Sequence, residues 1–228
     1  MIPRRALIVA HGSPADPAPQ EAALRALAAH TAALLPGWQV AGATLATSGA
    51  LETALAAVPG ARVLPFFMAE GWFTRHLLPD RLVAAGCATS RQLPAFGHHP
   101  GLGALLASSA QEAAAAHGLP STATLLLAAH GSRVSRASAR RTGELARELA
   151  RLTRFRIVTG YVEEAPFLRD AARIEGPALC LPLFATRASH VTRDIPRALE
   201  AAGFTGPLLP AIGEHAEVPR LLAGLLAA

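Results

Sequence analysis

The chain has 228 residues, 51% of them hydrophobic and 16% charged, which is enough apolar material for a packed core and too much for an intrinsically disordered protein. Its net charge of +5 comes from 21 basic residues, all of them arginine, and 16 acidic ones. The densest basic stretch, residues 136–154, has acids among its arginines and fits a solvated helix face, so we expect a globular protein with no nucleic-acid partner.

The first predicted element is a short apolar strand over residues 6–10, which ends at His11. It is too short for a signal sequence or a membrane span, and no later stretch reaches about 18 apolar residues without a break. The two cysteines, Cys87 and Cys180, have no CxxC spacing and suit reduced, buried thiols. We therefore expect a cytoplasmic protein without a membrane partner.

This first strand and the motifs after it recur later in the chain. Residues 6–13 (ALIVAHGS) return as 125–132 (LLLAAHGS), and three further motifs return in the same order. These are 64–67 with 181–184, 78–82 with 195–199, and 93–99 with 209–215. Four matches at a spacing of about 116 to 119 residues indicate two homologous halves. The turn-rich residues 118–121 mark the join, so we predict domains 1–118 and 119–228.

Each half alternates strands with helices, most clearly in the second half. There we predict strands over residues 122–129, 155–161, 178–184 and 207–212, and helices over 134–152, 166–174, 192–202 and 218–227. Apolar strands separated by helices are typical of a parallel sheet covered on both faces. The predicted fold class is α/β, with two homologous domains that each contain a four-stranded parallel sheet flanked by helices, and a cleft between them.

Polar residues follow three of the predicted strands in the second half. His130 follows the first strand, Glu163 and Glu164 follow the second, and Ser189 and His190 lie beyond the third. Because ligands of open parallel sheets bind beyond the carboxyl ends of the strands, we expect these residues to face one crevice. Two imidazoles and a carboxylate can hold a divalent transition metal and leave coordination positions open.

Ordinary structural roles stay open for each of these residues. His130 could be a turn residue, Gly131 and Ser132 could form a tight turn and a helix cap, and the glutamates could be exposed loop residues. Two other functional classes fit less well. A histidine phosphotransferase would need Arg before each His-Gly, where the chain has Ala10 and Ala129, and no Gly-x-Ser-x-Gly motif of a serine hydrolase is present.

Three motifs of the second half together form a specific pattern: residues 129–132 (AHGS), 161–166 (YVEEAP) and 181–196 (LPLFATRASHVTRDIP). They resemble those of the sirohydrochlorin chelatases of CbiX and SirB type, class II tetrapyrrole metal chelatases, in their long form with two fused halves. The resemblance implies insertion of Co2+ or Fe2+ into sirohydrochlorin, for cobalamin or sirohaem synthesis, without an organic cofactor. Ni2+ is also compatible with such ligands. A fused pair of halves implies a monomer.

Carried over residue by residue, the resemblance makes His130 and His190 the metal-site histidines, which would ligate the metal and accept pyrrole protons. Glu163 matches the acidic residue, as third ligand or proton relay. Glu164 stays an alternative, because the spacing to Pro166 is one residue shorter than the family pattern. The substrate has eight carboxylates, so nearby polar residues are candidate substrate contacts: Ser132, Arg133, Arg187, Ser189 and Arg193.

The first half departs from this pattern. It keeps His11, but Phe73 stands where the second half has His190, and Ala46 or Thr47 occupies the acidic position. We therefore expect the first half to keep the fold and to have lost its metal site.

Two questions about the first half stay open at this stage. His76 could restore a metal site there only if the local register shifted, and Trp72 and Phe73 could either line the cleft for the macrocycle or belong to the core. The first half is expected to keep the chelatase-like fold without its metal ligands, so the fold does not by itself imply catalysis. The rival hypothesis for the whole chain is therefore a non-catalytic carrier of metal or tetrapyrrole.

Overall fold

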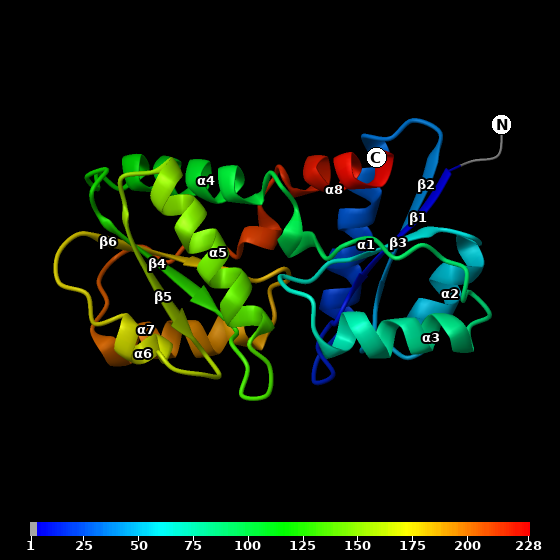
Figure 1. Ribbon diagram of the computed structural model, residues 1–228, viewed down its shortest axis with the longest axis horizontal. Coiled ribbons are helices and arrows are strands. Elements are labelled where there is room, and N and C mark those ends of the chain that lie inside the picture. The colour runs from blue at the N-terminus through cyan, green and yellow to red at the C-terminus, as the bar shows by residue number, and fades with distance from the viewer. Residues whose placement is uncertain (1–3) are drawn as a thin grey trace. The chain divides into compact units, whose positions relative to one another are not determined.

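The computed structural model describes residues 4–228, which form two compact α/β units (Figure 1). The first unit runs to His99 and also includes Ala216–Ala228, and the second unit is Pro100–His215. Each unit is built on a three-stranded parallel sheet whose middle strand is the first in its sequence. The α/β class and the parallel sheets are confirmed.

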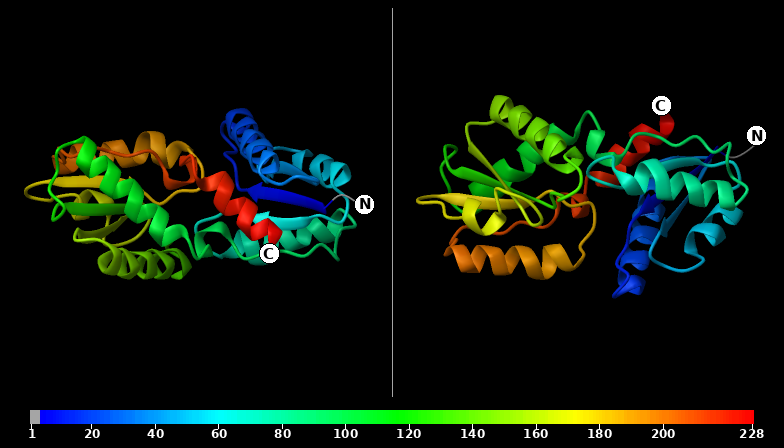
Figure 2. Two further views of the ribbon diagram at one scale, coloured as in Figure 1. Left: turned by 90° about the horizontal axis from the view of Figure 1, so that it is seen from above. Right: turned by 60° about the horizontal axis from the view of Figure 1, so that its bottom comes forward.

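In the first unit the sheet order is β2-β1-β3. The strands are β1 (Arg4–Ala10), β2 (Trp38–Thr44) and β3 (Arg62–Pro65). The helices α2 (Ala50–Ala57) and α3 (Leu78–Ala84) pack on one face, and α1 (Pro17–Ala33) and α8 (Val218–Ala227) lie on the other (Figures 1 and 2). Residues 6–10 of β1 are at most 1% exposed, as a central strand covered on both faces must be.

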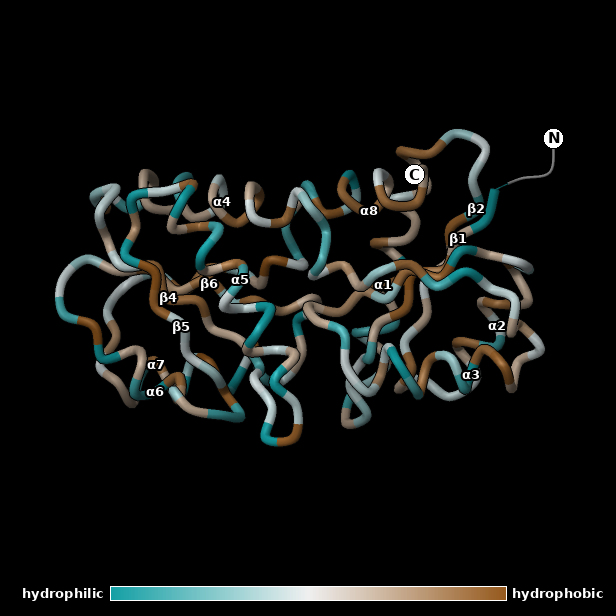
Figure 3. Tube along the Cα trace, viewed as in Figure 1, coloured by the Kyte–Doolittle hydropathy of each residue, from teal (hydrophilic) through white to brown (hydrophobic). Residues whose placement is uncertain are grey.

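The second unit repeats this plan, with the sheet order β5-β4-β6. Its strands are β4 (Thr124–Ala129), β5 (Arg156–Tyr161) and β6 (Ala178–Pro182). The helices α4 (Leu102–Ala116) and α5 (Ala137–Leu152) contact each other, while α6 (Leu168–Ala171) and α7 (Ile195–Ala202) pack into a separate apolar cluster. All six residues of β4 are buried, and the strand is among the most hydrophobic segments in Figure 3.

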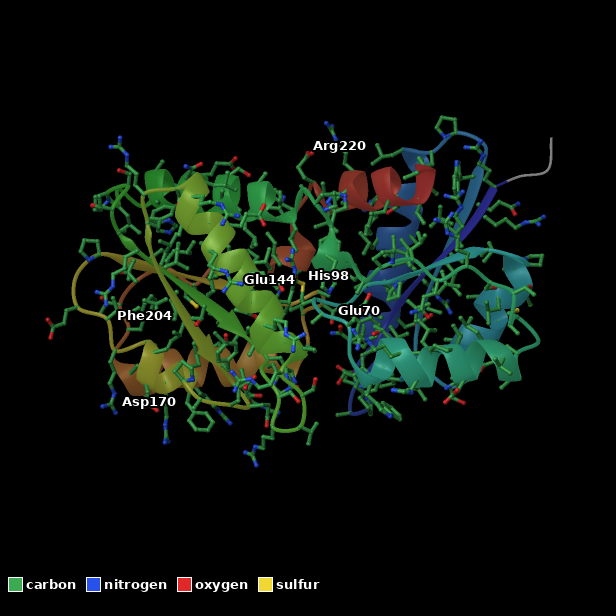
Figure 4. All side chains as sticks on the ribbon, in the orientation of Figure 1. Glu70, His98, Glu144, Asp170, Phe204 and Arg220 are labelled. Carbon is green, nitrogen blue, oxygen red and sulfur yellow. The ribbon has the colours of Figure 1, made fainter. Side chains whose placement is uncertain are left out.

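The closing helices are exchanged between the two halves of the sequence. Helix α4 belongs to the second unit, where it contacts α5 and β6, and α8 belongs to the first unit, where it contacts α1. Figure 4 shows Arg220 on the exposed side of α8, whereas Leu222 and Leu226 are fully buried. The compact units therefore differ from the expected division after residue 118, although the sequence repeat itself runs in that register.

The expected fourth strand over residues 207–212 does not form. This segment makes a single bridge to β6, between Cys180 and Leu208, with hydrogen bonds on either side of it. Pro207 has no N–H to donate to β6, and Pro182 at the end of β6 has none to donate to Leu209, so the ladder breaks off on both sides of the bridge. The sheet has three strands, with this segment along its edge.

The third strand of each unit leads into a π-helical turn. Phe73–Leu77 precedes α3 in the first unit, and His190–Asp194 precedes α7 in the second. The helix predicted over residues 192–202 therefore begins two residues earlier than expected, as a wider turn. Such turns are uncommon and occur often at functional sites.

Among residues 4–228, no helix is both long enough and apolar enough to cross a membrane.

Candidate metal centre

His130 lies where β4 leaves the core. The next residue, Gly131, has a φ of +71°, so the chain turns sharply and leaves the imidazole exposed at the carboxyl edge of the sheet. The Nδ1 atom of His130 is 2.8 Å from the carbonyl oxygen of Gly131. A carbonyl oxygen can only accept, so Nδ1 carries the proton and Nε2 keeps its lone pair for a metal.

His190 is fixed in the same tautomer by a carboxylate. It opens the π-helical turn, and its Nδ1–H donates to Oδ2 of Asp194 at 2.7 Å. Asp194 closes the same turn, four residues later, and its side chain is 31% exposed. A histidine held through Nδ1 by a carboxylate presents Nε2 as the ligating nitrogen and keeps its ring in a fixed orientation.

The two imidazoles are adjacent and form the centre of the site. Their ring centroids are 4.6 Å apart at an interplanar angle of 87°. Phe184, which is 9% exposed, lies beside both rings, with centroid distances of 6.3 Å to His130 and 6.2 Å to His190. Bonds of about 2.1 Å from a divalent ion to imidazole nitrogens fit rings at this separation.

The two candidate glutamates have different surroundings. The backbone N–H of Glu163 donates to the carbonyl of His130 at 2.9 Å, while its side chain stays 36% exposed with Oε2 3.7 Å from Nε of Arg133. The side chain of Glu164 is 11% exposed, and its Oε1 accepts from the N–H of Ser132 at 3.0 Å. Glu164 therefore braces the His-Gly-Ser loop, and the carboxylate of Glu163 is the more exposed of the two.

No third ligand joins the pair in this structure. Across residues 4–228, no group of three His, Cys, Asp or Glu side chains is placed to hold a metal ion. Cys180 is on the strand that leads to the site, but burial raises the pKa of its thiol to about 12, so no thiolate is available there near neutral pH. What the fold assembles is a two-imidazole site in which the Asp194 carboxylate is hydrogen bonded to one of the imidazoles.

The candidate substrate contacts have differing partners in the structure. Arg193 is 3.5 Å from Oδ1 of Asp194 through its Nε, and Arg187 and Ser189 are exposed on the loop before His190. Ser132 accepts hydrogen bonds from the backbone N–H groups of residues 134 and 135, at 3.3 and 3.2 Å. Arg187 and Arg193 are exposed to solvent, where a guanidinium can meet a dissolved anion.

The matching position in the first unit has the same backbone but different side chains. The N–H of Ala46 donates to the carbonyl of His11 at 2.9 Å, as Glu163 does to His130, so Ala46 occupies the acidic position. The ring of Phe73 packs against His11 with centroids 4.2 Å apart, and Leu77 stands at the position of Asp194. An aromatic ring thus fills the place of the second histidine.

Trp72 and Phe73 lie in different environments. Trp72 is 60% exposed, with its ring edge-on to that of Phe73 at 5.3 Å, whereas Phe73 packs against the core of the first unit. His76 is exposed and faces no second imidazole among the ring contacts of residues 4–228.

Asp194 is the residue that the motif analysis did not single out. Its signal in the sequence is the spacing of four residues from His190, which places two side chains on one face of a helical turn. The same spacing in the first half joins Phe73 to Leu77, so the histidine and its carboxylate are both replaced there.

Comparisons with known proteins agree with this fold. The CbiX family model matches residues 124–227. A solved structure of CbiX, described as the terminal enzyme for biosynthesis of siroheme in denitrifying bacteria, is 48% identical, with a TM-score of 0.90 over 98% of each chain. A search of curated proteins found no match.

Two structures of SirB share the fold at lower identity. SirB from Bacillus subtilis with Fe3+ is 17% identical, with a TM-score of 0.77 over 99% of this chain and 94% of that one. The sirohydrochlorin chelatase SirB from Bacillus subtilis subspecies spizizenii, in complex with cobalt, is 17% identical, with a TM-score of 0.74 over the same shares.

Two parallel-sheet units, with paired histidines at the carboxyl edge of one of them, define a two-unit chelatase-like α/β protein. The identity to the CbiX structure extends over nearly the full length of both chains. The chain belongs to the CbiX family of sirohydrochlorin chelatases.

Proposed function

We propose that this protein is a sirohydrochlorin chelatase that inserts Co2+ or Fe2+ into the macrocycle. The observation that carries the proposal is the pair His130 and His190, whose rings are 4.6 Å apart and whose Nδ1 protons are both held, in a chain 48% identical to CbiX. The metal ion is a substrate here and needs a site that releases it.

The two histidines supply such a site. Both Nε2 lone pairs are available, and two protein ligands leave most coordination positions of the ion to water, which exchanges readily. The four nitrogens of the macrocycle can then displace water first and the imidazoles last. A closed site with four protein ligands would hold the ion against the macrocycle.

Insertion releases two protons, because two pyrrole N–H groups lose their hydrogens as the divalent ion enters the ring. When the ion leaves an imidazole, its Nε2 lone pair is freed and can accept one of these protons. Asp194, already hydrogen bonded to Nδ1 of His190, stabilises the imidazolium that results. The carboxylate of Glu163 is partly exposed, and its backbone N–H is hydrogen bonded to the carbonyl of His130; we assign this residue the passage of protons to solvent.

The carboxylates of the substrate need cationic partners. Arg187 and Arg193 flank His190 and are exposed, and Arg133 follows the His-Gly-Ser loop. We assign these arginines to substrate carboxylates, since a planar guanidinium pairs with a carboxylate through two hydrogen bonds.

Anaerobic incubation with sirohydrochlorin and one metal at a time tests the proposal. We expect the absorbance change of metal insertion to be faster with enzyme than without it for Co2+ or Fe2+, and the same assay with Ni2+ measures the breadth of metal use. A carrier would bind the metal or the tetrapyrrole tightly and leave the rate at its spontaneous value, which would refute catalysis.

A further inference from the structure

The first unit has a polar pocket at the edge of its sheet where the three strands begin, which is the edge away from His11. A pocket of about 560 Å3 opens there beside the end of α8. We call it the arginine pocket, and it is lined by Arg4, Arg5, Trp38, Pro59, Gly60, Arg62, Ala227 and Ala228. Its volume is in the range of small-molecule sites.

Three guanidinium groups in this pocket are held in place by neutral partners. The guanidinium carbons of Arg4 and Arg62 are each 5.7 Å from the centre of the Trp38 ring. Arg5 donates to the side-chain oxygen of Gln39 and to the carbonyl of Pro59, both at 3.2 Å. Arg62 also donates to the carbonyl of Leu226 at 2.9 Å.

These contacts order the cations without neutralising them. In the part of the chain that the structure describes, Arg4, Arg5 and Arg62 form no ion pair with an acidic side chain or with the carboxylate of Ala228. Three positive charges around one pocket repel one another, and a bound anion would replace this repulsion with attraction. Because the side chains are already ordered, an anion would meet little further entropy loss.

The second unit shows that the fold does not require this arrangement. At the positions that correspond to Arg5, Trp38 and Arg62 it has Thr124, Phe155 and Leu179. A pocket of about 570 Å3 that includes Phe155 is lined by two arginines, Arg151 at the end of α5 and Arg154 in the loop after it. The one arginine on the strands of the second unit, Arg156, stands where the first unit has Gln39, so the cluster of Arg4, Arg5 and Arg62 is an addition to the common fold.

We propose that the arginine pocket binds a small polyanion that carries at least two carboxylate or phosphate groups. Each guanidinium keeps N–H groups that its present hydrogen bonds do not use, and these can pair with two oxygens of one anionic group. Arg4 and Arg62 approach Trp38 together, so the indole both positions them and reports on their environment. The inference goes beyond metal insertion and does not depend on it.

Fluorescence of Trp38 tests the proposal in a Trp72→Phe background, where it is the remaining tryptophan. The probes are pyrophosphate and benzenehexacarboxylate, with sodium chloride at matched ionic strength as the reference. We expect saturable binding of at least one probe, weakened about tenfold by Arg62→Gln, as for the loss of one charge-assisted hydrogen bond. Arg91→Gln removes an exposed charge elsewhere in the same unit and should leave binding unchanged.

Tighter binding of benzenehexacarboxylate would assign the pocket to carboxylate-rich ligands, and tighter binding of pyrophosphate would assign it to phosphate-bearing ones. The proposal is overturned if neither probe saturates, if chloride gives the same response, or if Arg62→Gln binds like the parent. Circular dichroism checks the fold of each variant, and Arg4→Gln, whose side chain is exposed, replaces Arg62→Gln if that variant does not fold.

Discussion

At the scale of single residues, the tautomers of two histidines determine what the site can bind. His130 is set by the carbonyl of Gly131, which is part of the backbone, whereas His190 is set by the side chain of Asp194. The first unit lacks both members of the second pair, since Phe73 and Leu77 stand in their places, and it still forms the same π-helical turn. Asp194 therefore serves the imidazole and not the turn.

Replacement of Asp194 should impair metal handling while the fold remains intact. We expect Asp194→Ala to lower kcat/KM for metal insertion about 10- to 100-fold, the usual effect of removing a carboxylate behind a metal-binding histidine, with a raised KM for the metal. Asp170→Asn, which changes an exposed carboxylate on α6 (labelled in Figure 4), is the matched control. An unchanged KM for Co2+ in Asp194→Ala would contradict the positioning role.

The sequence predicts part of the site because strand ends determine part of it. A histidine directly after a buried strand, such as His130, must lie at the carboxyl edge of a parallel sheet. The directions of Glu163 and Glu164 depend instead on a loop, and adjacent residues there take different partners, Arg133 and the N–H of Ser132. No residue pattern in the sequence distinguishes these two outcomes.

At the scale of elements, the loop between β4 and α5 holds His130 in place. Gly131 has a positive φ, and a Cβ there would lie 2.9 Å from Cγ of Glu164 and from Cβ of Tyr161. The glycine is thus needed both for its backbone conformation and for the close approach of β5.

Gly131→Ala should therefore destabilise the second unit more than a comparable change elsewhere. Gly176→Ala shares the positive φ, of +85°, but has no atom within 4 Å of the added Cβ, so it should cost only about 1–2 kcal/mol. The collision at Gly131 adds about 1–3 kcal/mol. Chemical denaturation of the two variants measures the difference, and equal losses of stability would argue against the close packing of this loop.

Element prediction succeeded where apolar periodicity is strong and failed where proline intervenes. The helix predicted over residues 218–227 has those bounds, but residues 207–212 hold two prolines and form only one bridge. The π-helical turn before α7 also escapes prediction, because its side-chain spacing resembles that of an α-helix.

At the scale of the whole molecule, the exchange of α4 and α8 is invisible in the sequence. Both helices bury leucines, among them Leu106 in α4 and Leu222 in α8, and either could cover either sheet by periodicity alone. The contacts show which sheet each helix covers, since α8 packs against α1 of the first unit and α4 against α5 of the second. The spacing of the repeated motifs indicates that the sequence is duplicated, whereas the packing of the helices determines which residues belong to each compact unit.

The exchange predicts which sheet each helix protects. Leu222→Ala should cost about 2–5 kcal/mol and speed hydrogen exchange in β1, β2 and β3, while Leu106→Ala, equally buried, should do so in β4, β5 and β6. Hydrogen-exchange mass spectrometry reads both variants. The reverse pattern, in which each helix protects the sheet of its own half of the sequence, would refute the exchange.

The central claim is that His130 and His190 of the second unit carry metal insertion, and the His190→Ala variant tests it most directly. Its rate with sirohydrochlorin and Co2+ or Fe2+, followed anaerobically by absorbance, should fall to the spontaneous rate while circular dichroism stays like the parent. His30→Ala, at an exposed histidine of α1, should insert at the parent rate. Parent-like insertion by His190→Ala would contradict the account.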